Sequence, residues 1–103
     1  MSVQAPDRHI EITPGLAGGE PHIRGHRIKV RDIVVWHEQM GRSADEIASE
    51  YSLSLAQVYA ALAFYFDHRD AIDGAIARHR DFVDDLRRNL SSALERKLTA
   101  KNG

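Results

Sequence analysis

A chain of 103 residues with 43% hydrophobic residues and a formal net charge of −1 is expected to form one small domain with a modest core. The absence of cysteine excludes disulfides and thiolate metal sites. No apolar run is long enough for a transmembrane helix, and residues 1–9 have no signal-peptide pattern, so we expect a cytoplasmic protein without a membrane partner. Because the net charge is near zero, any nucleic-acid footprint must be local.

Residues 1–8 are predicted to form a flexible N-terminus, and residues 9–13 alternate as in a first short strand. Further along, β-branched residues flank a turn at Gly25, which predicts a small hairpin of two strands. Alternation places Ile28 and Val30 on one face of this hairpin. The other face carries the basic side chains Arg27, Lys29 and Arg31.

Three helices are expected after the hairpin, the first over residues 30–40. Ser43 and Ser54 stand just before the next two helical patterns and are expected to cap them, the third helix ending at Phe66. A short turn between these two helices gives helix-turn-helix spacing. We therefore predict a mainly α fold with a homeodomain-like helix-turn-helix core, an N-terminal β-hairpin and a long C-terminal helix. Residues 9–66 would form the dimerisation and DNA-binding domain.

The hairpin segment also carries a family resemblance. The run Gly18-Gly-Glu-Pro-His-Ile-Arg-Gly-His-Arg-Ile-Lys-Val-Arg-Asp-Ile33 resembles the signature of a bacterial domain-of-unknown-function family (DUF four-three-three). The match resumes at three later segments, residues 43–47, 60–65 and 67–73, and departs at His26, where the family usually has threonine. Small members are identified as VapB-like antitoxins, often encoded beside PIN-like nuclease toxins. The resemblance therefore implies an antitoxin whose partner is a PIN-like (VapC-type) ribonuclease.

The basic residues of the hairpin are the first candidates for contact with operator DNA, since lysine and arginine bind phosphates. Together with two residues near the starts of the second and third helices, the candidates are Arg24, Arg27, Lys29, Arg31, Arg42 and Gln57. The alternative is a structural ion pair that ties Arg24 or Arg27 to the first helix. Its acceptor would be Asp32 or Glu38.

The third helix is apolar on nearly all sides, which is typical of a helix buried on several faces. A chain of this size can hardly cover such a helix, so we expect a homodimer. The residues predicted to form its interface are Val58, Leu62, Phe64 and Phe66.

Residues 67–103 are predicted to be a helical tail that binds a partner, with weak points at Gly74 and Asn89. Aliphatic residues recur along it in steps of three and four between charged positions, as in a helix that docks into a groove. The candidates for partner contact are Ile72, Ile76, Arg80, Val83, Leu86, Arg87 and Leu90. The alternative is a structural helix that folds back on its own dimer.

The six histidines do not predict a metal site, because no acidic residue or cysteine completes a ligand set at the required spacing. His22 and His26 are interpreted as turn and surface residues, and His37 and His79 as half-buried helix residues. No catalytic constellation or cofactor motif is evident, so we expect no enzyme, cofactor or metal.

The sequence thus favours a type II antitoxin that neutralises a ribonuclease and regulates its own operon. The alternatives are a stand-alone DNA-binding regulator with a helix-turn-helix, and a structural dimeric adaptor. The toxin of such a pair is expected to carry an acidic metal site. This chain has none, so the nuclease would be its partner.

Overall fold

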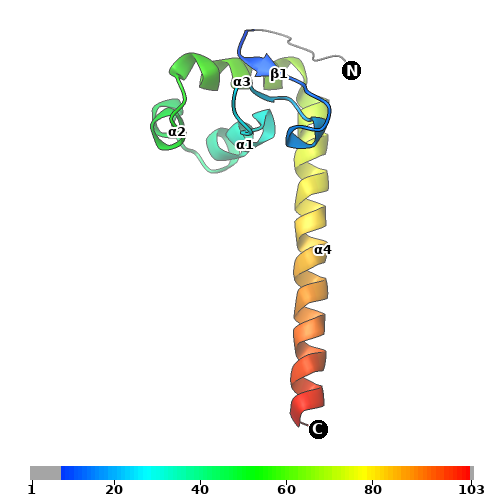
Figure 1. Ribbon diagram of the computed structural model, residues 1–103. Helices are drawn as coiled ribbons and strands as arrows, with labels where there is room; N and C mark the ends of the chain where they lie inside the picture. The colour runs from blue at the N-terminus through cyan, green and yellow to red at the C-terminus, as the bar shows by residue number, and fades with distance from the viewer. Residues whose placement is uncertain (1–7, 103) are drawn as a thin grey trace. The chain divides into compact units, whose positions relative to one another are not determined.

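The computed structural model describes residues 8–102, with side chains for residues 8–98. It confirms a mainly helical chain with a small antiparallel pair of strands near the N-terminus and a long C-terminal helix (Figure 1). The predicted flexible N-terminus lies outside the described residues apart from Arg8. The elements are β1 (Ile10–Glu11), the 3-10 turn η1 (Ala17–Gly19), β2 (His22–Ile23), α1 (Val30–Val34), the π-helical turn η2 (Val35–Gln39), α2 (Ala44–Tyr51), α3 (Leu55–Asp67) and α4 (Arg69–Asn102).

The two strands and the turn after them form one small antiparallel unit. Ile10 of β1 lies opposite Ile23 of β2, and His22 forms a bridge to Lys29 on the other side. The backbone N–H of Ile23 donates to the carbonyl of Ile28 at 2.9 Å. Gly25 closes the turn with φ of 79°, a left-handed conformation that favours glycine. The predicted hairpin at Gly25 is therefore present, and β1 adds to its outer edge.

The first predicted helix has the expected start and end but not the expected hydrogen-bond pattern. It is α-helical only to Val34, and Val35–Gln39 is π-helical. The N–H of Met40 reaches back five residues to the carbonyl of Val35, at 2.9 Å. Trp36, within this turn, stacks on Tyr51 of α2 with ring centroids 4.0 Å apart.

The helix-turn-helix pair begins where the serine caps predicted. The N–H of Glu46 donates to Ser43 Oγ, and the N–H of Gln57 donates to Ser54 Oγ, both at 3.1 Å. Each bond satisfies one of the backbone donors that a helix start leaves unpaired, a contribution of about 1 kcal/mol. Between the helices Ser52 adopts a left-handed conformation with φ of 56°.

Helix α3 is the centre of the core and packs against α1, α2 and both strands (Figure 1). Its residues Val58, Leu62 and Phe64 are at most 8% exposed within the single chain, whereas Phe66 is 54% exposed. The expectation that one chain could not cover these residues is wrong for the first three, because α1 and α2 pack on the same helix. Of the four predicted interface residues, Phe66 alone stays exposed.

Helix α4 is continuous from Arg69 to Asn102, without a break at Gly74 or Asn89. The chain forms two compact units, and the first ends at Asp73, within α4. We had expected the first domain to end at Phe66, seven residues earlier. Within the first unit, Ile72 is 3% exposed, and the Tyr65 hydroxyl donates to Asp73 Oδ1 at 2.9 Å. Ile72, expected to bind a partner, is therefore a core residue. Among the described residues no helix has the length and apolar character needed to cross a membrane.

Candidate functional site

Acidic residues upstream of the first helix hold most of the basic side chains of the hairpin. Arg24 Nε lies 3.3 Å from Glu11 Oε1, although the Arg24 side chain stays 63% exposed. Lys29 Nζ lies 3.5 Å from Glu20 Oε2. Arg31 Nε donates to both carboxylate oxygens of Glu20, at 2.8 and 3.1 Å, and the Arg31 side chain is only 11% exposed. Lys29 and Arg31 therefore fasten the start of α1 to the segment before β2.

The structural ion pairs of the hairpin thus exist, but with acceptors other than those that the sequence suggested. Asp32 Oδ2 instead accepts the backbone N–H of Lys29 at 3.0 Å, which is the role of an acidic residue in the first turn of a helix. Glu38 Oε2 lies 3.9 Å from His37 Nδ1. Among the described residues, neither carboxylate forms an ion pair with Arg24 or Arg27.

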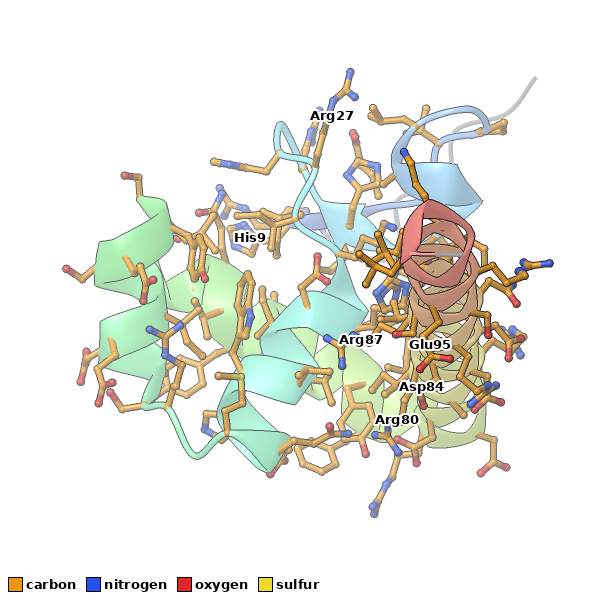
Figure 2. The ribbon with its side chains drawn as sticks, turned by 90° about the horizontal axis from the view of Figure 1, so that it is seen from below. His9, Arg27, Arg80, Asp84, Arg87 and Glu95 are labelled. Carbon is orange, nitrogen blue, oxygen red and sulfur yellow. The ribbon has the colours of Figure 1, made fainter. Side chains whose placement is uncertain are left out.

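Arg27 is the hairpin cation that lacks an acidic partner among the described residues. It is also exposed. Figure 2 shows its side chain pointing away from the ribbon. Arg27 and the largely exposed Arg24 flank Gly25 in a turn closed by backbone hydrogen bonds. These two arginines are the part of the predicted DNA-binding set that the structure leaves open to a phosphate.

His22 holds this turn from inside and is fully buried, so its interpretation as a turn or surface residue is wrong. Its Nδ1 lies 2.9 Å from the carbonyl oxygen of His26 and 3.0 Å from that of Ile23, which makes Nδ1 the protonated, donating nitrogen. Its Nε2 lies 3.4 Å from Thr13 Oγ1. His22 therefore fixes the backbone that presents the two arginines. In the sequence, the one signal for this role was its position beside the apolar Ile23 at the start of the predicted hairpin, which is not specific.

The remaining histidines give no sign of a ligand set. His37 is half-buried as expected, but His79 is exposed. His68, which the sequence did not single out, stacks on Phe64 with ring centroids 4.1 Å apart. Within the described part of the chain, no three His, Cys, Asp or Glu side chains are grouped so that they could hold a metal ion.

The two helix-turn-helix residues predicted to contact DNA have structural roles. Arg42 forms an ion pair with Glu50, and its hydrogen bond to Tyr51 is the main cause of a raised pKa of the guanidinium. Gln57 Oε1 accepts the N–H of Ser54 at 2.8 Å, which completes the capping box of α3. Both side chains are thus engaged within the chain through these atoms.

The distal part of α4 carries large apolar side chains in contact with solvent. We call Leu86, Leu90, Leu94 and Leu98 the distal leucine row; their side chains are between 52% and 63% exposed. Steps of four residues keep them along one side of the helix. Charged residues flank the row, and Figure 2 shows Arg80, Asp84, Arg87 and Glu95 together on one side of α4. This face is amphipathic, and its leucines stay exposed within the described part of the chain.

The comparisons with known proteins concern mainly the first unit. The profile of the family described as "Protein of unknown function (DUF433)" matches residues 10–65, more than half of the chain. The chain belongs to the DUF433 family. A DUF433 member from Anabaena variabilis ATCC 29413, solved by crystallography, is 36% identical, with a TM-score of 0.63; the similarity covers 67% of this chain and 68% of that one. No curated protein matches the chain. The family profile ends before α4, so the distal leucine row lies outside the matched DUF433 segment.

Proposed function

We propose that this DUF433 protein is a non-enzymatic antitoxin that binds a PIN-like ribonuclease through α4 and operator DNA through the hairpin turn. The observation that carries the proposal is the distal leucine row, four leucines more than half exposed on a helix rich in charged residues. A helix with apolar anchors on one face and charges elsewhere suits a hydrophobic groove on a partner protein.

The row can supply only part of the free energy that a stable complex needs. Full burial of a leucine side chain contributes about 1.5–3 kcal/mol, and a little over half of each side chain is still available. The four together then offer on the order of 4–6 kcal/mol before the cost of association. Polar contacts at the rim of the groove would supply the rest.

Arginines beside the row supply the charge that a nuclease partner would recognise. Arg87 is exposed and, in the described part of α4, forms no ion pair with an acidic side chain, whereas its neighbour Arg88 pairs with Asp85. The family resemblance implies a partner with an acidic metal site. A guanidinium can form paired charge-assisted hydrogen bonds with such carboxylates, so Arg87 is the residue expected to reach the site.

The nuclease proposal is tested by identifying a PIN-like protein encoded beside this gene and co-expressing it with the chain. Wild-type chain should co-purify with it and stop RNA cleavage. Replacing Leu86 and Leu90 with Asp should abolish both effects, because two carboxylates would be buried in the groove. The matched control places Asp at Asn89 and Ser92, exposed positions of α4 outside the row, and should behave like wild type. Equal loss in both double variants, or the absence of any PIN-like neighbour, would refute the proposal.

The DNA-binding part rests on Arg24 and Arg27 at the turn. Replacing both with Ala should make the slope of log K against log salt less negative by about 0.9 for each lost phosphate contact. The control replaces Arg87 and Arg88 with Ala, which removes the same charge from the tail. If the Arg24 and Arg27 double variant leaves the slope unchanged, these arginines have a structural role and do not contact phosphates. Retained DNA binding without nuclease inhibition would favour the stand-alone regulator.

A further inference from the structure

The outer face of α3 is an apolar surface that neither proposed activity uses. We define the α3 outer face as Leu55, Tyr59, Ala63 and Phe66, which follow one another at steps of four, four and three along one side of the helix. Leu55, Tyr59 and Phe66 are 43%, 58% and 54% exposed, and Ala63 is also exposed. A reading helix would present polar groups to base edges here. We infer that this face instead pairs with the same face of a second copy, in antiparallel orientation.

The arrangement of large and small side chains is what argues for a second copy. In a two-fold interface, residue i contacts residue j and j contacts i. If the axis lies near the level of Ala61, Tyr59 meets Ala63 of the second copy, and Phe66 lies within about one residue of the level of Leu55 of the second copy. Each large ring in the middle of the face then has a small residue opposite, which lets the two helices approach closely. Binding to a different protein would not require large and small residues to be placed symmetrically along this face.

The charges of α3 are compatible with this pairing. No charged residue occurs between Leu55 and Phe66, so two copies of the face do not repel each other. The antiparallel orientation brings Asp67, at the C-terminal end of one helix, beside the N-terminal end of the other, where a negative charge is favourable. Arg69, with its guanidinium 5.8 Å from the Phe66 ring centroid, lies at the edge of the face.

The test measures the molar mass of the full chain by sedimentation equilibrium. Wild type should be a dimer, and replacing Tyr59 and Phe66 with Asp should raise its dissociation constant by at least about 30-fold, the effect of losing an interface hot spot. The matched control with Asp at Leu86 and Leu90 should remain dimeric. Circular dichroism checks that each variant keeps its helices. A monomeric wild type, or dissociation caused by the α4 control, would overturn the inference.

A second measurement does not depend on disrupting the face. Because the chain contains no cysteine, a single cysteine gives an unambiguous cross-link. Ala63→Cys should be joined to itself in a second copy by a short bismaleimide, since the two positions lie close to the proposed axis. Ser49→Cys, exposed on α2, is the control and should stay monomeric on denaturing gels. Cross-linking through position 49 but not position 63 would place the interface elsewhere.

Discussion

The apolar stripe of α4 should divide into two energetically different parts, because its members are periodic in sequence but unequally buried. Ile72 is 3% exposed, whereas Leu90 is 63% exposed. Replacing Ile72 with Ala removes buried side-chain atoms and should cost about 2–5 kcal/mol of folding free energy. Replacing Leu90 with Ala in the isolated protein should change the stability by no more than about 0.5 kcal/mol.

The assay is urea unfolding followed by tryptophan fluorescence. Trp36 is the chain's single tryptophan and stacks on Tyr51 within the first unit, so its signal reports that unit alone. Small domains have a total stability of about 5–15 kcal/mol, and 1 kcal/mol shifts the melting temperature by about 4–8 °C. In thermal melts followed by the same fluorescence signal, Ile72→Ala should therefore lower the melting temperature by about 8 °C or more.

Two results would refute this division of the stripe. An Ile72→Ala variant as stable as wild type would mean that the first unit does not extend into α4. A Leu90→Ala variant as unstable as Ile72→Ala would mean that the distal leucine row is already covered in the isolated protein. In the second case the row could not be the docking face for a nuclease.

Three further predictions concern local features. The hydrogen bond to Asp73, together with burial, raises the pKa of Tyr65. The stabilisation that the protonated Tyr65 hydroxyl provides is therefore complete below about pH 10 and is lost as the pH rises through the raised pKa. Tyr65→Phe should reduce this alkaline loss of stability in melts measured at several pH values. Ser52→Gly should stabilise the chain by up to about 1 kcal/mol in urea, because φ of 56° is costly for serine; a loss of stability would contradict this. Zinc added to chelator-treated protein should leave the melting temperature unchanged, and a saturable rise of several degrees would reveal a missed site.

Local signals in the sequence were sufficient to place the helix starts. The serine caps at Ser43 and Ser54 locate α2 and α3 to the residue, since a cap depends only on the next three residues of chain. The π-helical turn at Val35–Gln39 has no such local marker. It accompanies the stacking of Trp36 on Tyr51, a contact between segments well apart in the sequence.

Burial and ionic partners could not be predicted in the same way, because they depend on which segments meet. The stripe of α4 has the same period at Ile72 as at Leu90, and only the fold of the first unit distinguishes them. Arg31 was expected on the polar face of the hairpin but lies in the first turn of α1 with an 11% exposed side chain. Its acceptor Glu20, which Lys29 shares, lies in an irregular segment whose path the sequence does not indicate.

The salt dependence of DNA binding would connect the hairpin with the α3 outer face. A dimer has two hairpin turns, so Arg24 and Arg27 supply four cations; full phosphate contact would contribute about −3.6 to the slope of log K against log salt. A chain made monomeric by Asp at Tyr59 and Phe66 keeps one turn and should show about half that contribution, although neither substitution alters an arginine. Measured on the same operator fragment, an unchanged slope in the monomeric variant would separate DNA binding from dimerisation. The α3 helix would then pair copies for another purpose, as in the structural adaptor.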